Sequence, residues 1–227
     1  MDKNRKLVFW TSIGFSVAGV ANLILFAVLS SMQIVATRNL SYVFAVGFIA
    51  SVWVPMMLNL LFKIKFDLIL LISYNAFMFL SICCGSLWGF YTLLVGFDKF
   101  IHFVSGVLFA ILAYNLFNNG KKNKVSLVWL FIICFSISMM CGGLWEIYEF
   151  TTDILLGNNA QGTVGQIGRD AIMDTMFDLV CDFVGSLIGA AVAVLLERHA
   201  NKTNKHKILK GDKEKETVNN TKAIQGK

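Results

Sequence analysis

Six long apolar segments dominate the sequence. The core of a bilayer is about 30 Å thick, and a helix needs about 20 apolar residues to cross it. Hydrophobic residues make up 56% of the chain and charged residues only 15%, whereas soluble domains carry about 25% charged residues. An ordinary soluble domain is therefore excluded, and the sequence predicts an all-α fold, a polytopic membrane bundle of six transmembrane helices. The expected spans are roughly 7–30, 40–62, 68–91, 99–117, 127–150 and 171–196.

The positions of the basic residues predict the orientation of these spans. Of the 20 Lys and Arg residues, 17 lie before the first span, in the connections after the second and fourth spans, and after the sixth. Only Arg38, Lys99 and Arg169 lie in the other connections. Because Lys and Arg are enriched in cytoplasmic loops, both termini are expected in the cytoplasm, and the connection 151–170 is expected outside.

Two domains are expected, a transmembrane domain over 1–196 and a basic tail over 197–227. The tail holds nine Lys and Arg, four acids and almost no apolar residues, so it cannot bury enough surface to become ordered. We expect a disordered cytoplasmic tail. Its charge favours contact with the anionic head groups of membrane lipids. Nucleic acid is not an expected partner, because the chain has no basic groove with interleaved aromatic residues.

A proline and five cysteines lie within the predicted spans. Pro55 lacks an N–H group, so it should kink the second span and free a backbone carbonyl that a neighbouring helix must satisfy. The cysteines are odd in number and do not form a CxxC pattern, so they predict apolar packing rather than disulfides or a metal site. They are Cys83, Cys84, Cys134, Cys141 and Cys181.

Six acids and one histidine lie within the last three spans or directly before them, where insertion costs about 2.5–3.5 kcal/mol for each charged group. The fourth and sixth spans begin on the outer side and the fifth ends there, so all seven should meet in one leaflet. The sequence thus predicts one outward-facing intramembrane site, built from residues 98–182. Its members are Asp98, His102, Glu146, Glu149, Asp174, Asp178 and Asp182.

The spacing of these residues predicts which way they face. Neighbouring members on each span are three or four residues apart, so each set lies on one side of its helix. Each of these sides is expected to face the interior of the bundle. In the sixth span the same side continues with Gly185 and Gly189, a spacing that lets a neighbouring helix approach closely.

Six carboxyl groups around one imidazole cannot all stay charged unless protons, a metal ion or basic side chains join them. Lys99 and Arg169 are near in sequence, but two cations cannot balance six anions. The suspected cofactor is a divalent metal ion, Mg²⁺, Mn²⁺, Ca²⁺ or Zn²⁺, with iron also compatible. The alternative is a hydrogen-bonded network of partly protonated carboxyls that ties three helices together. The expected metal ligands are His102, Glu146, Glu149, Asp174, Asp178 and Asp182.

Three motifs carry a family resemblance: DKFIHFVSG at 98–106, WEIYEF at 145–150, and DTMFDLVCD at 174–182 followed by Gly185. Together they resemble the YjdF-type bacterial inner-membrane proteins. That family is distantly similar to the VanZ-like group, one member of which is linked to glycopeptide-antibiotic tolerance. The resemblance covers roughly 98–196 and implies a multi-pass protein of the bacterial cytoplasmic (inner) membrane, in which the three acidic sets belong together. It implies no reaction.

Three functions are compatible with this site. The first is a divalent-metal-dependent enzyme that acts on a lipid-linked or phosphate-bearing envelope substrate, with Asp98 or His102 as catalytic base. The second is a cation- or proton-coupled transporter. The third is a non-catalytic envelope-stress factor that binds a lipid or a partner protein. The chain lacks known phosphatase motifs and an arginine cluster for phosphate, and the acids stop near the bilayer midplane without an inverted repeat to support transport.

Overall fold

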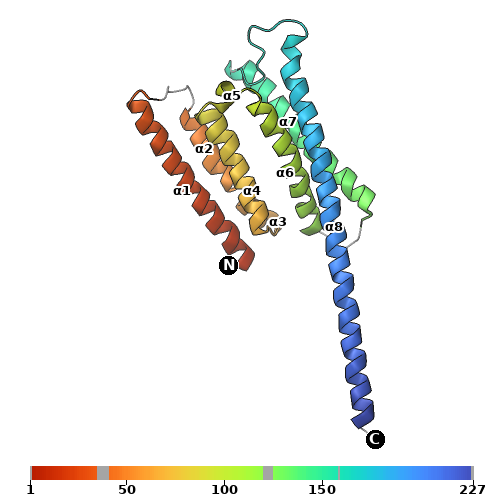
Figure 1. Cartoon of the computed structure of the whole chain (residues 1–227). Helices are drawn as coiled ribbons and strands as arrows, with labels where there is room; N and C mark the ends of the chain where they lie inside the picture. The colour runs from red at the N-terminus through yellow and green to blue at the C-terminus, as the bar shows by residue number, and fades with distance from the viewer. Residues whose placement is uncertain (1, 35–40, 120–124, 158, 226–227) are drawn as a thin grey trace.

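The structure is a computed structural model that describes residues 2–34, 41–119, 125–157 and 159–225, and its regular elements are all helices (Figure 1). Most are α-helices, and η1 is a π-helix that directly continues α4. In chain order they are α1 (Lys3–Ser31), α2 (Ser41–Val52), α3 (Val54–Phe62), α4 (Leu68–Met78), η1 (Phe79–Leu87), α5 (Phe90–Leu93), α6 (Phe97–Asn119), α7 (Leu127–Leu156) and α8 (Asp170–Gln225).

Within the described residues, five helical segments are long and apolar enough to cross a membrane, and a shorter apolar segment, Val46–Phe62, accompanies them. This confirms the predicted polytopic helical bundle. Both termini lie toward the same end of the bundle (Figure 1), as an even number of crossings predicts. That this end faces the cytoplasm stays a prediction of the charge distribution. The five long segments are Lys3–Ser31, Leu68–Leu87, Phe97–Phe117, Leu127–Leu156 and Ile172–Thr203.

The shorter segment is broken at Trp53, between α2 and α3. Pro55 lies in the first turn of α3 and has no N–H group to donate to Ser51, four residues earlier. The hydroxyl of Tyr74, on α4, donates instead to the Ser51 carbonyl at 3.0 Å. The predicted kink is confirmed, and a neighbouring helix satisfies the carbonyl that the proline frees.

Replacing Tyr74 with phenylalanine should lower the free energy of unfolding by about 1–3 kcal/mol, because the Ser51 carbonyl would lose its partner in an apolar surrounding. Unfolding of the purified protein in mixed micelles would measure the change. Tyr148→Phe is the control, since the Tyr148 side chain is exposed and its loss should change stability by less than about 0.5 kcal/mol. Equal effects of the two substitutions would contradict this role of Tyr74.

Helices α6, α7 and α8 pack on one another, and α6 and α8 approach most closely where glycines meet backbone. A Cβ atom on Gly189 would lie 2.6 Å from the carbonyl oxygen of Val107, and one on Gly106 would lie 2.7 Å from that of Asp182. A Cβ on Gly185 would overlap the carbonyl of Phe103. The predicted close approach of a neighbouring helix at Gly185 and Gly189 is confirmed.

The variant Gly185→Ala should therefore be destabilised by about 1–3 kcal/mol, the usual cost of forcing extra volume into a packed interior. Gly143→Ala, on α7, is the matched control because a Cβ there meets no atom within 4 Å. Alanine favours a helix by about 1 kcal/mol over glycine, so Gly143→Ala should be neutral or stabilising. Melting temperatures in detergent would compare the two, and a neutral Gly185→Ala would show that α6 and α8 can separate at little cost.

All five cysteines are free thiols. Cys83 packs in an apolar cluster with Phe48 and Val52. Cys134 packs in another cluster, with Leu130 and Ala190. These two thiols act as small apolar packing groups, as predicted.

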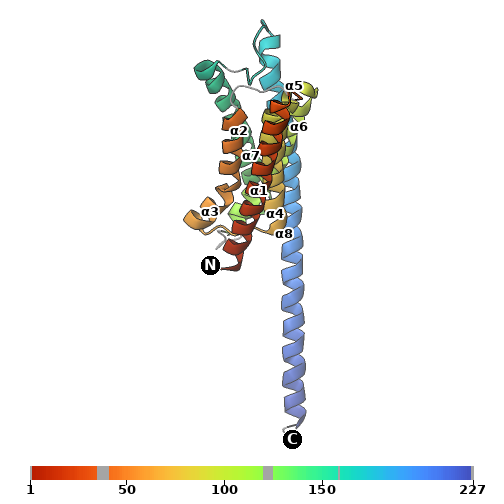
Figure 2. The same ribbon diagram turned by 90° about the vertical axis from the view of Figure 1, so that its left-hand side faces the viewer.

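The backbone of the basic tail continues α8 as a helix to Gln225 and projects beyond the bundle (Figure 2). The sequence predicted disorder here, because the tail has no apolar side to bury. A helix that has already begun extends without a new nucleation cost, and the Lys and Glu residues of the tail are good helix formers. The backbone is therefore helical rather than irregular, while the division of the chain at 196 and 197 stays a prediction.

Candidate functional site

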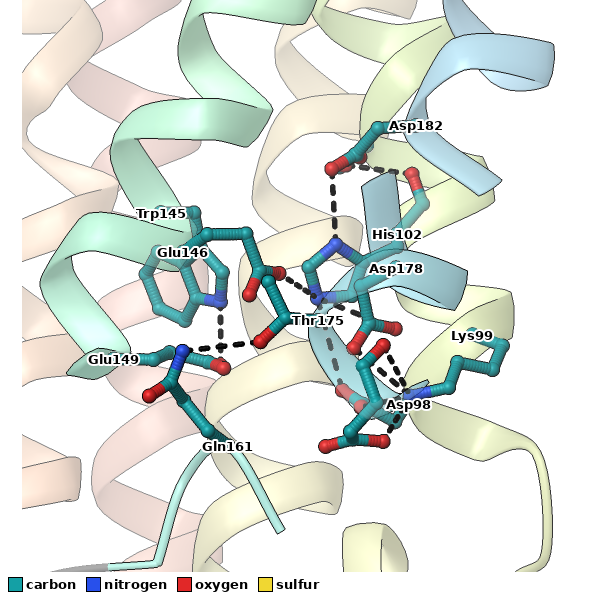
Figure 3. A network of polar contacts seen from close by, with 12 residues as sticks. Asp98, Lys99, His102, Trp145, Glu146, Glu149, Gln161, Thr175, Asp178 and Asp182 are labelled. Atoms are coloured by element: carbon teal, nitrogen blue, oxygen red, sulfur yellow. Dashed lines mark hydrogen bonds and ion pairs between the residues drawn. The ribbon is translucent and has the colours of Figure 1, made fainter. Parts of the chain in front are cut away.

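The ionisable residues of the last three spans gather at the end of the bundle opposite the termini. They come from the beginning of α6, the second half of α7 and the first turns of α8, and most point toward one another (Figure 3). His102, Glu146, Asp178 and Asp182 are buried, with 1–5% of each residue exposed. The inward direction predicted from the spacing is thus observed for these four residues.

Asp182 holds the imidazole of His102. Its Oδ2 lies 3.0 Å from His102 Nδ1, and its Oδ1 accepts a hydrogen bond of 2.9 Å from the Ser105 hydroxyl. Gly142 lies directly against the Asp182 carboxyl, where a Cβ would overlap it. The ring of His102 therefore has a set orientation, and its second nitrogen, Nε2, faces away from Asp182.

Three carboxyl oxygens surround His102 Nε2. They belong to Glu146 at 3.7 Å, Asp98 at 3.8 Å and Asp178 at 3.9 Å. These separations exceed the 2.7–3.2 Å of a normal N–H···O hydrogen bond. One side of the imidazole is therefore held by a carboxylate, and the other faces three oxygens without bonding to any of them.

Two of these three oxygens have no hydrogen-bond partner among the described residues, and neither has the second oxygen of Glu146. Both carboxyl oxygens of Glu146 and Oδ1 of Asp178 are buried without a hydrogen-bond partner. A buried polar atom without a partner costs about 1–3 kcal/mol, and more when it is charged. A proton or a cation bound among the oxygens around His102 Nε2 would remove this cost.

Lys99 lies on the other side of the same carboxyls. Its ammonium group pairs with Asp178 at 2.8 Å, with Asp98 at 3.2 Å, and with Asp174. Asp98 and Asp178 each use Oδ2 for this lysine and turn Oδ1 toward His102. Sequence reasoning named Lys99 only as a nearby cation. Because an unpaired lysine inside a membrane is costly, the pairing of Lys99 with the acids could have been predicted from the sequence.

Glu149 and Asp174 lie farther from His102 Nε2 than the sequence suggested. Glu149 accepts a hydrogen bond of 2.8 Å from the indole of Trp145, and Asp174 pairs with Lys99. Of the six expected metal ligands, the structure thus brings His102, Glu146 and Asp178 together, with Asp182 behind the ring. Asp98, expected as a base, joins them.

The connection between α7 and α8 folds back beside the site. Asp153 accepts backbone hydrogen bonds from Ala160 and Gln161, which give this connection a defined path. The Gln161 amide then donates to the Thr175 hydroxyl at 3.0 Å, beside Glu146 (Figure 3). The sequence did not predict Thr175 or its pairing with Gln161, because this pairing depends on how the connection folds back.

The donor atoms suit a divalent metal ion. Asp98, His102 and Asp178 each offer one ligand atom, and these atoms all lie within 4.8 Å of one another. Ligand atoms about 2.0–2.2 Å from Zn²⁺ are themselves roughly 3.0–3.6 Å apart, so a contraction of a few tenths of an ångström would bring Glu146 and His102 to bonding positions. Imidazole together with carboxylates suits Zn²⁺, Mn²⁺ or iron.

An apolar cavity of about 350 Å³ adjoins the site. It lies between α6, α7 and the continuous pair α4 and η1, and His102 and Ser105 form part of its wall. The remaining wall is largely apolar, with Phe77, Phe109 and Leu144 among its residues. Volumes of 300–1,000 Å³ are typical of sites for small molecules.

This fold and this site define a polytopic helical membrane protein that buries acids around one histidine. Residues 18–199 match the family of predicted membrane proteins DUF2238, and because the match spans most of the chain, the chain belongs to this family. The description of this family as membrane proteins agrees with the membrane location that the sequence motifs imply. A likeness to the VanZ-like group stays a prediction.

A relative from Thermotoga maritima, described as an uncharacterized protein, is 30% identical over 108 residues. The aligned part is 48% of this chain and 53% of the relative. The chain thus matches about half the length of that protein. No solved structure matches the chain.

Proposed function

We propose that the protein is a divalent-metal-dependent membrane enzyme that acts on a lipid-linked or phosphate-bearing substrate from the outer leaflet of the bacterial cytoplasmic membrane. One observation carries the proposal: three carboxyl oxygens stand 3.7–3.9 Å from His102 Nε2, and two of their carboxyls have buried oxygens without a hydrogen-bond partner. A protein-bound cation would satisfy these atoms together.

Asp182 supports this assignment from the other side of the ring. Histidines that bind metals generally donate their second N–H to a carboxylate or carbonyl, which sets the ring orientation and strengthens the metal bond. Asp182 makes this contact with Nδ1 at 3.0 Å. We therefore propose His102, Asp178 and Glu146 as ligands, with Asp98 close enough to join them, and Asp182 as the residue that positions His102.

Asp98 is the residue best placed to exchange protons with a substrate or water. Its side chain is 27% exposed, against 1% for Asp178, and its Oδ1 faces His102 while Lys99 holds its Oδ2. A bound divalent cation would supply a Lewis acid and lower the pKa of coordinated water. Asp98 would take the proton that such chemistry releases, and the bound cation would attract an anionic head group.

The packing below the site favours this function over a transporter. The Ser138 hydroxyl donates to the Gly106 carbonyl at 2.7 Å, and the Ser186 hydroxyl donates to Ser138 at 2.8 Å. The polar groups at this depth are thus paired with one another, and α6 and α8 meet there backbone to backbone. This arrangement favours a site entered from one side.

Metal analysis of the purified protein tests the proposal, with a matched pair of variants on α7. Glu146→Gln should lose most of the bound metal, because Glu146 faces His102. Glu149→Gln should keep it, because Glu149 binds the Trp145 indole instead. Equal metal content in both variants, or a metal-free wild type that also takes up no added Zn²⁺ or Mn²⁺, would overturn the assignment.

Release of phosphate separates an enzyme from a binding protein. The metal-loaded protein would be incubated with phosphatidic acid and with a polyprenyl diphosphate in mixed micelles. We expect metal-dependent release of phosphate that Asp98→Asn reduces by about 10²–10⁴-fold, the usual contribution of a general base. Full metal binding without turnover of either lipid would favour the non-catalytic function.

A further inference from the structure

We propose that the apolar cavity beside His102 holds the hydrocarbon chain of a membrane lipid, whose phosphate-bearing head group reaches the acidic site. This inference rests on the proposed function and specifies its substrate as an amphiphile that enters from the bilayer. The cavity has a volume of about 350 Å³, which falls in the range of small-molecule sites.

Along α6, the polar wall residues of the cavity lie nearer the start of the helix than Phe109 does. His102 and Ser105 contribute polar groups at its outer end, and Phe109 lines it seven residues deeper. At 1.5 Å per residue, this places Phe109 about 10 Å below His102 along the helix. The cavity thus runs from the charged site toward the bilayer centre, which is the course of a lipid chain below its head group.

The position of α7 makes the cavity reachable from the membrane. Among the described helices, α7 packs mainly on α6 and α8, and the cavity separates it from η1. Leu144 and Tyr148 line the cavity, and each is more than half exposed at the surface of a membrane span. At this depth the surrounding solvent is lipid, so a hydrocarbon chain is the occupant that fits.

The π-helix η1 is a second, independent feature of the same wall. Ser81 and Ile82 of η1 line the cavity, and the Ser81 hydroxyl is already paired with Tyr91 at 2.8 Å. This part of the wall therefore has no unpaired Ser81 hydroxyl, as suits a surface that binds a hydrocarbon chain. π-Helices are rare and occur frequently at functional sites.

Protection of Cys141 from alkylation tests the inference on the wild-type protein. Cys141 lines the cavity, whereas Cys181, on α8, does not belong to its wall. Lysophosphatidic acid, a single-chain lipid with a phosphate head, would be added in detergent at about ten times its dissociation constant. Occupancy should then slow alkylation of Cys141 about tenfold and leave that of Cys181 unchanged.

A pair of neighbouring substitutions gives a second measurement. Cys141→Phe should fill the cavity and abolish retention of lysophosphatidic acid in native mass spectrometry. Met140→Phe should not, because Met140 is 55% exposed on the membrane-facing side. Failure of lysophosphatidic acid to protect Cys141, or equal retention by both variants, would overturn the inference.

Metal content distinguishes this outcome from failure of the proposed function. Cys141→Phe should keep its bound metal, because Cys141 is not among the assigned ligands. Glu146→Gln should lose metal but still protect Cys141 when lysophosphatidic acid is present. A wild-type protein that binds no metal, but in which lysophosphatidic acid still protects Cys141, would contradict the metal site and leave the lipid inference standing.

Discussion

Replacing Lys99 with methionine should lower the free energy of unfolding by about 3 kcal/mol. Removing one partner of a buried ion pair costs about 3–5 kcal/mol, and the lower end applies because the Lys99 side chain is 28% exposed. The substitution would leave Asp178, which is 1% exposed, without its cation. Unfolding in mixed micelles at low ionic strength and without divalent ions would measure the effect.

Arg169→Met is the control, because it removes a basic residue from the same side of the bundle but at an exposed position. Its effect should stay within about 0.5 kcal/mol. Divalent cations should recover part of the stability lost in Lys99→Met, since they would supply charge to Asp98 and Asp178. A stable Lys99→Met variant would mean that these carboxyls are neutral, as in the partly protonated network.

Adding a divalent cation should stabilise the wild-type protein by about 2.7 kcal/mol at a concentration 100 times its dissociation constant. The gain follows because the unfolded chain lacks the assembled group of Glu146, Asp178 and His102. Melting curves with Zn²⁺, Mn²⁺ and Mg²⁺, each compared with chelator, would rank the metals. We expect chelator to lower the melting temperature of the protein as purified.

The variant Asp178→Asn should lose this response, because Asp178 contributes one of the buried oxygens beside His102. Asp170→Asn, at the exposed start of α8, should keep it. The pair removes the same charge from the same helix, so a general effect of net charge would appear in both. If neither metal nor chelator shifts the wild type, the three helices are joined by protonated carboxyls instead.

Much of the fold could be predicted from the sequence, because a bilayer imposes length and charge rules on any chain that crosses it. The apolar segments and the even number of crossings were predictable in this way. So was the effect of Pro55, since the missing N–H group leaves a specific carbonyl free. The helical tail was not predicted, because burial rules do not account for a helix that extends from one already formed.

The candidate site was predictable as a set of residues but not as a set of roles. The spacing of Asp98 and His102, and of the three acids on α8, predicts that each set lies on one side of a helix. Spacing does not predict how far each helix is rotated against its neighbours. Glu146 and Glu149 differ by about 60° around α7, and this rotation directs one to His102 and the other to the Trp145 indole.

The sequence by itself determined the membrane bundle, the gathering of seven ionisable residues in one leaflet, and the close contact at Gly185, because helix period and bilayer thickness are properties of a single segment. Only the tertiary structure decided that Lys99 joins three acids, that Asp182 holds one nitrogen of His102, and that an apolar cavity adjoins the other side of the site. These features depend on side chains from different helices meeting at distances of a few ångströms, which no single segment specifies.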